Sequence, residues 1–195
     1  PSPAPAETMD HRNTMTVRLA RASDALASTD QDGLLAGANL ALAGDELIQF
    51  QTAYHLDGMD WRLSGLLRGR RGTEWAINTH SANEAFTLIE PETLASLSLP
   101  VTSGPVSVMA IGVGDESPVI ATIDFANAAL RPPSPAHLRA TELPDGSMAL
   151  QWVRRSRKGW SWPDHVDAPL AEESEQYRID LLPTPGLQRS ETVSM

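Results

Sequence analysis

Cysteine is absent from the 195 residues of the chain. Its absence excludes disulfides, thiolate metal sites and a cysteine nucleophile, and it leaves the redox compartment undetermined. Lysine is almost absent too, because Lys158 is the only lysine among 15 basic residues. With 25 acidic residues the formal net charge is −10. The chain therefore lacks the net basic character that general binding of nucleic acid usually needs.

Long apolar segments are also missing. The longest runs, such as Val106–Val113, fall well short of the ~20 residues that span a bilayer. Pro1–Glu7 has neither the basic start nor the apolar middle of a signal peptide. We therefore expect a protein that is not embedded in a membrane.

The sequence lacks a recognisable catalytic motif as well. It has no Gly-x-Ser-x-Gly elbow. Gly112–Gly114 is followed by neither the lysine nor the helix of a phosphate-binding loop. His165, between Asp164 and Asp167, is the nearest approach to a metal site, but a metal needs three or four converging ligands and this short stretch between prolines favours a solvated loop.

One acid–base alternative remains, a hydrolase in which His80 works with Glu74 or Glu84. These residues lie in a loop and at its exits, at a spacing that acidic surface loops produce by chance. We therefore expect no enzymatic activity, and no metal or cofactor.

What the chain does contain is a period-two alternation of apolar and polar residues, which predicts β-strands and a mainly β fold. The predicted strands are Met15–Leu19, Asn39–Leu42, Glu46–Leu56, Ala85–Ile89, Val106–Val113, Val119–Phe125, His137–Glu142, Ser147–Val153 and Gln176–Leu182. Another predicted strand starts at Trp61, with Leu63 and Gly65 on the same inward face. Short helical turns are predicted at Gly33–Gly37 and Pro91–Leu97.

Two of these predictions concern burial. In Glu46–Leu56 the alternation assigns Ile48, Phe50, Thr52, Tyr54 and Leu56 to a buried face, and Gln49, Gln51 and His55 to a polar face. Val106–Val113 and Val119–Phe125 are apolar on both sides, which predicts burial on both faces.

The most distinctive segment is Trp61–Trp75, in which a strand runs into a loop that holds Arg68, Arg70 and Arg71. Two interpretations are open for these arginines. They could lie on an exposed loop neutralised by nearby acidic residues, or form ion pairs between subunits, for which the guanidinium fork is well suited. We take Arg68, Arg70 and Arg71 as candidate interface residues.

A second cluster, Trp160 and Trp162, follows an arginine-rich run. These tryptophans are candidates for a protein interface, for packing within their own domain, or for stacking on a sugar or base. We include both among the candidate interface residues.

Proline divides the chain. The proline-rich residues 1–8 predict a stiff linker. Arg131–Pro135 holds three prolines in four residues and predicts a boundary between a β-rich domain, 9–131, and a second domain, 132–195. A β-sandwich needs about 7 strands and ~100 residues, so the second domain, with about three predicted strands, is expected to be partial.

Three segments carry a family resemblance: Gly37–Phe50, Trp61–Glu74 and Arg131–Arg139. They resemble the C-terminal region of the tail-tip or baseplate hub proteins of gene transfer agents and related siphophages. Those proteins join a TIM-barrel domain of glycoside-hydrolase type, hub domains and a fibronectin type III-like module. The resemblance spans nearly all of residues 13–182, and it implies that the partial second domain is fibronectin type III-like.

The resemblance implies a non-enzymatic structural component of a phage-like tail tip, with roles in tail assembly, host-envelope contact and DNA delivery. It also implies a homotrimer that contacts neighbouring tail proteins and a host-envelope glycan or protein. The particle would be made in the bacterial cytoplasm, and no sequence-specific nucleic-acid partner is expected. The barrel that would carry a hydrolase activity has no counterpart in this chain. The alternative function is a carbohydrate-binding module with Trp160 and Trp162 as stacking platforms.

Overall fold

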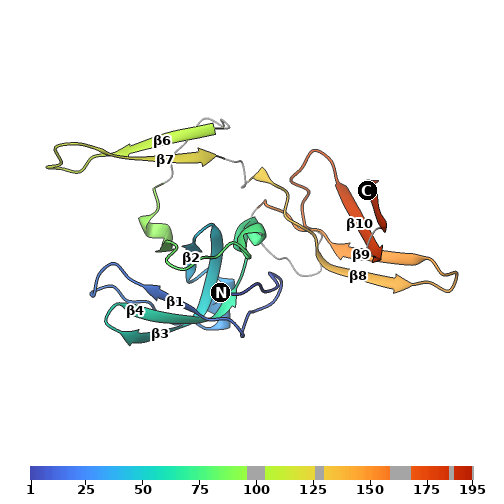
Figure 1. Ribbon diagram of the computed structural model, residues 1–195, viewed down its shortest axis with the longest axis horizontal. Coiled ribbons are helices and arrows are strands. Elements are labelled where there is room, and N and C mark those ends of the chain that lie inside the picture. The colour runs from blue at the N-terminus through green and yellow to red at the C-terminus, as the bar shows by residue number, and fades with distance from the viewer. Residues whose placement is uncertain (96–103, 126–129, 159–167, 185–186, 195) are drawn as a thin grey trace. The chain divides into compact units, whose positions relative to one another are not determined.

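The computed structural model describes residues 1–95, 104–125, 130–158, 168–184 and 187–194. These residues form four antiparallel sheets, one short α-helix and three 3-10 helices (Figure 1). The prediction of a mainly β fold is confirmed. The chain divides into two compact units, Pro1–Arg131 and Pro132–Met195.

The N-terminal unit is built around a five-stranded sheet in the order β1-β4-β3-β2-β5. All neighbouring strands in it are antiparallel. Its strands are β1 (Met15–Arg18), β2 (Leu40–Ala43), β3 (Glu46–Asp57), β4 (Asp60–Leu67) and β5 (Phe86–Leu88). Because β1 and β5 each pair on one side alone in this sheet, they are its two edges.

The hydrophobic core of this unit is formed mainly by residues of this sheet. Its buried residues are Met15, Val17, Leu26, Ala41, Ala43, Ile48, Phe50, Leu63 and Leu66. The predicted burial of Ile48, Phe50 and Leu63 is confirmed, and Trp61 packs against the cluster while half-buried. Every member of the core falls between residues 15 and 66, so the sheet contains its own apolar interior.

The buried face changes halfway along the hairpin of β3 and β4. Phe50 and Ala53 both pack in or against the core, and so do Leu66 and Leu63 on the facing strand, although the members of each pair are three positions apart. A regular strand would turn one member of each pair outward. Gly65 lies between the two leucines at φ +64°, where a side chain is disfavoured, and the strands bend there.

This bend explains where the alternation in Glu46–Leu56 misleads. It does not account for Gln49, which is buried on the polar face because its amide contacts Leu34, Ala38 and Arg70. Thr52, Tyr54 and Leu56 were predicted on the buried face, yet all three are exposed, Tyr54 by 57% and Leu56 by 42%. The prediction was wrong for Thr52, Tyr54 and Leu56 because it assumed one unbroken period of two along the whole strand.

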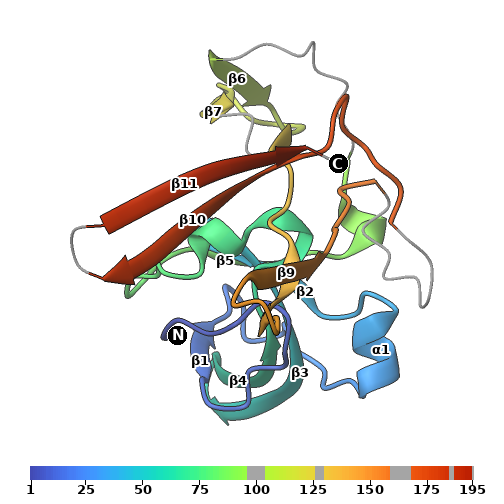
Figure 2. The ribbon, with the colours of Figure 1, turned by 90° about the vertical axis from the view of Figure 1, so that its right-hand side faces the viewer.

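Short helices connect the strands of this unit. The helix α1 (Gln31–Leu35) begins after Asp30, whose side chain accepts a hydrogen bond from the Gly33 N–H at 2.8 Å. Figure 2 shows α1 beside the sheet. The 3-10 helices η1 (Arg70–Gly72) and η2 (Glu74–Ala76) follow β4, and η3 (Pro91–Thr93) follows β5.

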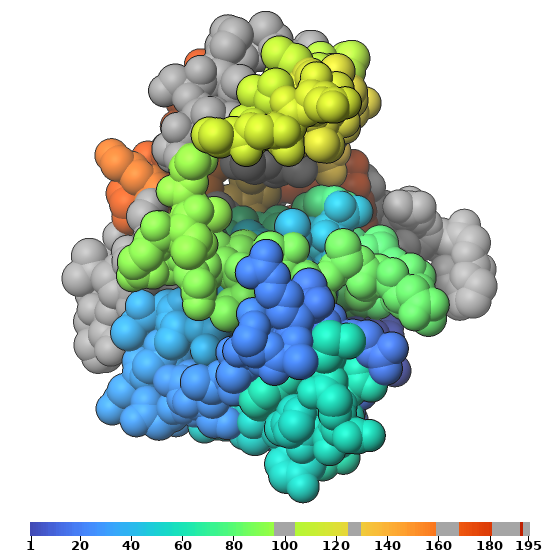
Figure 3. Space-filling model, turned by 90° about the vertical axis from the view of Figure 1, so that its left-hand side faces the viewer, coloured from blue at the N-terminus to red at the C-terminus, as the bar shows by residue number. Residues whose placement is uncertain are grey.

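Residues 104–125 form a separate two-stranded ribbon of β6 (Gly104–Ala110) and β7 (Val119–Phe125). The predicted burial of both faces is wrong. Met109, Val119, Ile120 and Ile123 are each at least half exposed, and Figure 3 shows the surface of this ribbon in yellow-green. Among the described residues, no third strand pairs with the ribbon, so these four side chains face solvent.

The C-terminal unit contains two hairpins. One joins β8 (Ala136–Glu142) to β9 (Met148–Val153), and the other pairs β10 (Gln176–Thr184) with β11 (Leu187–Ser194). The rings of Trp152 and Tyr177 meet edge to face, with centroids 4.9 Å apart, and so link β9 to β10. That this unit is part of a fibronectin type III-like sandwich stays a prediction.

Candidate functional site

Arg68 is the most deeply buried large side chain of the arginine loop, with no exposed surface. It follows the end of β4 and meets Glu46, the first residue of β3, which is also fully buried. The Arg68 Nε donates to Glu46 Oε1 at 2.9 Å, and Nη2 donates to Oε2 at 2.8 Å. This two-point contact matches the guanidinium fork to both carboxylate oxygens, which is the strongest geometry for such a pair.

The interface prediction for Arg68 is therefore wrong, because the side chain is enclosed by its own domain. Three arginines in four positions look equivalent in the sequence. What distinguishes Arg68 from the other two is the hairpin of β3 and β4 in the structure. Its register pairs Gln49 with Leu67, so Glu46 lies close to the residues that follow β4. A carboxylate at that point needs a cation when both are buried.

The ion pair has further partners from distant parts of the chain. The Gly69 N–H donates to Glu46 Oε1 at 2.6 Å. On the guanidinium, Nη1 lies 3.5 Å from Asp10 Oδ2 and donates to the Ser2 carbonyl at 3.0 Å. Residues 1–8, which were predicted as a linker, thus contact the domain through Ser2. Both the Glu46 carboxylate and the Arg68 guanidinium therefore have hydrogen-bonding partners beyond each other.

His80 adds a third ionisable group beside Glu46. Its Nε2 lies 2.5 Å from Glu46 Oε2, and its Nδ1 lies 2.5 Å from Glu84 Oε1. An ionised carboxylate only accepts hydrogen bonds, so a ring that carries both protons satisfies both contacts. We define the charge network as Asp10, Glu46, Arg68, His80 and Glu84.

The charge network also tests the sequence-based acid–base candidates. The structure does bring His80 and Glu84 together, as the hydrolase alternative requires. The other ring nitrogen, however, faces Glu46, whose carboxylate is shared with Arg68. A general base needs one ring nitrogen aimed at a substrate proton, whereas both nitrogens of His80 are directed into the protein.

Asp10 lies at the opposite end of the charge network and is almost fully buried. Burial raises the pKa of Asp10, but hydrogen bonds from the backbone and side chain of Asn13, the backbone of Arg12 and the charge of Arg68 together hold this pKa below its usual value. The carboxylate is therefore stabilised in its ionised form, as the neighbouring guanidinium requires.

Arg70 and Arg71 occupy different environments from Arg68. Arg70 is half-buried, and its Nε donates to Gln49 Oε1 at 2.8 Å. The Gln49 Nε2 in turn donates to the carbonyls of Leu34, at 2.8 Å, and Ala38, at 2.7 Å, so this buried amide fixes α1 against β3. Arg71 is exposed, at φ +53°. An interface role for Arg70 and Arg71 stays a prediction.

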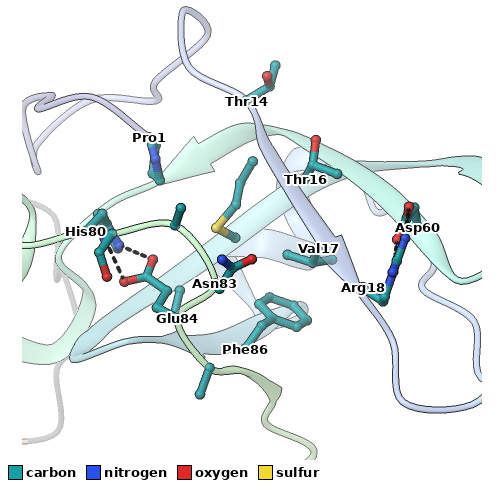
Figure 4. Close-up of a pocket in the computed structure, with 15 residues that line it drawn as sticks. Pro1, Thr14, Thr16, Val17, Arg18, Asp60, His80, Asn83, Glu84 and Phe86 are labelled. Carbon is teal, nitrogen blue, oxygen red and sulfur yellow. Dashed lines mark hydrogen bonds and ion pairs between the residues drawn. The ribbon is translucent and has the colours of Figure 1, made fainter.

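A cleft of about 860 Å³ borders the charge network. It is lined by β1 on one side and by the segment 80–86, which leads into β5, on the other. Figure 4 shows His80 and Glu84 at one end of this cleft and the ion pair of Arg18 with Asp60 at the other. Its volume is within the range of ~300–1,000 Å³ that is usual for ligand sites.

The second arginine cluster, in the C-terminal unit, is organised by carboxylates. Arg154 Nη1 donates to Glu175 Oε2 at 2.6 Å, and Arg157 pairs with both oxygens of Glu172 at 2.7 and 3.1 Å. The Tyr177 hydroxyl donates to Glu175 Oε1 at 2.7 Å. These contacts hold the chain before β10 against the end of β9.

The remaining predicted residues lie elsewhere. Trp160 and Trp162, and also the Asp164–Asp167 segment, lie outside the described residues. Within the part of the chain that is described, no group of three or more His, Asp or Glu side chains is arranged to hold a metal ion. No helix in that part is long and apolar enough to cross a membrane.

Comparison with known families gave a match that covers the charge network. Residues 1–87 match the family model described as Rcc01698-like, C-terminal. This is a domain family of gene transfer agents and phages. The matched segment contains β1 to β4 and all five residues of the charge network, while the β6–β7 ribbon and the C-terminal unit lie beyond it.

The Rcc01698-like match agrees with the resemblance based on Gly37–Phe50 and Trp61–Glu74, since both segments fall within it. The finer assignment to a tail-tip hub goes beyond what the match describes. A search of the curated proteins gave no match.

Proposed function

We propose that this chain is a non-enzymatic structural component of a phage-like tail tip or baseplate hub. The observation that carries the proposal is the Rcc01698-like C-terminal match over residues 1–87, a segment that holds both the folded sheet and its charge network. The proposed roles are tail assembly, contact with the host envelope and DNA delivery.

The chemistry of the charge network supports a structural role. Arg68 and Glu46 are fully enclosed, and both nitrogens of His80 face carboxylates of the same domain. Such a network fixes the N-terminal segment, the start of β3 and the loop after β4 relative to one another. A stiff unit of this kind suits a particle component that transmits load through protein contacts.

The proposed partners are other copies of the same chain, in a homotrimer, together with neighbouring tail proteins and a host-envelope glycan or protein. The proposed location is the tail tip of a virion or phage-like particle that is made in the bacterial cytoplasm. Arg70 and Arg71 are the candidates in the loop after β4 for contact with another subunit, because Arg71 is exposed and Arg70 is half-buried.

Electron microscopy of particles tests this proposal. An epitope tag inserted at Val113, in the exposed turn between β6 and β7, gives an antibody access to the chain. Antibody label at the tail tip of purified particles is the expected result. Label on the capsid, or a complete absence of the tagged chain from infectious or gene-transferring particles, would refute the proposal.

Two biochemical measurements address the other functional classes. A glycan array compares the unmodified chain with a variant that carries Trp160→Ala and Trp162→Ala; glycan binding lost in that variant would favour the carbohydrate-binding alternative. Hydrolysis of cell-wall polysaccharide by the unmodified chain, lost in the His80→Ala variant, would favour the hydrolase alternative. We expect no hydrolysis by the unmodified chain or by His80→Ala.

A further inference from the structure

The two edges of the five-stranded sheet face each other across the cleft. In the order β1-β4-β3-β2-β5 the edges are the two ends of the sheet, yet residues of β1 and of the segment that enters β5 line the same cleft. Figure 4 shows β1 on one side and Glu84 and Phe86 on the other. The sheet therefore curls until its ends approach, and the pairing pattern stops short of closure.

The free edge of β1 presents main-chain groups to this cleft. In an antiparallel pair, residues alternate between those that bond to the neighbouring strand and those whose N–H and C=O point away. The Leu19 N–H donates to the Met59 carbonyl at 3.0 Å, and the register continues through Val17 opposite Trp61. Thr16, in the alternate position, therefore directs its N–H and C=O away from β4.

The free edge of β5 has the same property. The Gly44 N–H donates to the Ala85 carbonyl at 2.9 Å, and the Ile89 N–H donates to the Leu40 carbonyl at 2.8 Å. These bonds fix the phase of the β2–β5 ladder, which leaves Phe86 in the alternate position. Phe86 lines the cleft, and its main-chain groups point away from β2.

The strand directions allow one added strand to join both edges. Four successive antiparallel pairings lead from β1 to β5, so β1 and β5 run in the same direction. A single strand that runs the opposite way is antiparallel to both. It would complete a closed sheet of alternating directions and remove both exposed edges, which are a general liability of open sheets.

We propose that this cleft binds an extended, basic polypeptide segment from a partner protein, which inserts as a strand between β1 and β5. Main-chain hydrogen bonds to Thr16 and Phe86 hold the segment, as in other cases of strand addition to a sheet edge. At about 3.3 Å per residue, the four residues of β1 span about 13 Å of such a segment.

The walls of the cleft specify the side chains of this segment. Met15 and Val17 are buried on the inner side of β1, so every second residue of the segment should be apolar. Within the lining, Asp60 pairs with Arg18 and Glu84 contacts His80, so the acidic character comes from the chain as a whole, with its formal net charge of −10. Basic residues at the outward positions of the segment complement this charge.

This inference goes beyond the proposed tail function and does not rest on it. The cleft would bind such a segment in the isolated chain, whatever particle the chain comes from. A failure of strand binding would leave the microscopy of particles unaffected, and the reverse also holds.

The test uses an acetylated and amidated hexapeptide of alternating lysine and valine as the probe, titrated into the full 195-residue chain. We expect a Kd below about 1 mM and amide shifts in NMR spectra at Thr16 and Phe86. The same peptide with N-methyl groups on alternate residues loses the donors toward one edge, and should bind at least about tenfold more weakly. A peptide of alternating glutamate and valine should also bind more weakly.

Two variants at one position separate main-chain from side-chain recognition. Thr16→Pro removes the N–H that points into the cleft and should abolish binding, whereas Thr16→Ala keeps that N–H and should still bind the peptide. The N-methylated peptide decides the question even where Thr16→Pro does not fold. Three results would overturn the proposal. They are equal binding of the methylated and unmethylated peptides, no binding at a peptide concentration of about 1 mM, and amide shifts confined to residues other than Thr16 and Phe86.

Discussion

At the scale of single residues, the buried pair of Arg68 and Glu46 dominates the N-terminal unit. Each partner depends on the other, because a buried charge without its counter-ion destabilises the folded chain. The complete pair adds little stability beyond that of an apolar pair of the same size. Three positions along, Arg71 has the same charge and an exposed side chain. The two arginines therefore form a natural comparison.

Replacing Arg68 with alanine should destabilise the chain by about 3–5 kcal/mol, because it leaves the Glu46 carboxylate buried and without its fork. Replacing Arg71 with alanine should change the free energy of unfolding by less than about 0.5 kcal/mol. Urea titrations followed by circular dichroism measure both. Similar values for the two variants would contradict the enclosed ion pair.

Acid should weaken the unit through Asp10. Its pKa in the folded chain lies below the ordinary 3.8, so the unfolded chain takes up the proton first as the pH falls. The stabilisation from Asp10 is therefore complete above about pH 4 and is lost as the pH drops through the folded value. Asp10→Asn lacks this titration.

The free energy of unfolding, measured between neutral and acidic pH, checks this sign. The difference between the unmodified chain and Asp10→Asn should be largest at neutral pH and should shrink as the pH falls below 3.8 and through the folded pKa. A difference that stays constant across this range would show that Asp10 is not held in its ionised form by its neighbours.

At the scale of elements, the loop after β4 depends on glycine. Gly69 has φ +56°, and a β-carbon there would lie 2.8 Å from the Glu74 Cα, which belongs to backbone that cannot swing away. Gly58 has the same φ of +56°, but a β-carbon there would meet nothing within 4 Å. Alanine at Gly58 or Gly69 would therefore meet the same backbone strain, but only at Gly69 would the added methyl group collide with Glu74.

Gly58→Ala should therefore cost about 1–2 kcal/mol from its left-handed backbone alone. Gly69→Ala should cost this amount and about 1–3 kcal/mol more, because the surrounding loop has to shift. Thermal and urea denaturation of the two variants give the difference directly. Equal losses would mean that the loop accommodates the methyl group freely.

The strands also show how much of the fold can be predicted from the sequence. Alternation placed Ile48, Phe50 and Leu63 in the core correctly, since period two is a local property that each strand carries by itself. It failed at Tyr54 and Leu56, because the bend at Gly65 arises from two strands together. Pairing between strands is a tertiary feature that a single period does not contain.

The charge network was less predictable than the strands. His80 and Glu84 are four residues apart, so their contact could be suggested from spacing. The contacts of Arg68 with Glu46 and Asp10 cross 22 and 58 residues, and no local pattern encodes them. The arginine loop was recognised as distinctive, but which arginine turns inward depends on the register of β3 with β4.

At the scale of the whole molecule, the N-terminal unit contains its complete core. All of its buried cluster comes from residues 15–66, so a fragment of residues 1–131 should fold without the C-terminal unit. We expect the amide spectrum of residues 1–95 in this fragment to match that in the full chain. Widespread changes in these signals would show that the unit needs residues 132–195 to fold.

The charge network also sets the order in which this unit can form during synthesis. Arg68 contacts residues as far back as Ser2, 66 positions earlier, and the last member of the network is Glu84. Contacts between distant residues pay the entropy of closing a long loop before they contribute stability, which slows folding. A nascent chain therefore cannot complete its buried charges until residue 84 has left the ribosome, so residues 2–84 emerge with these charges still in water and fold late, as one piece.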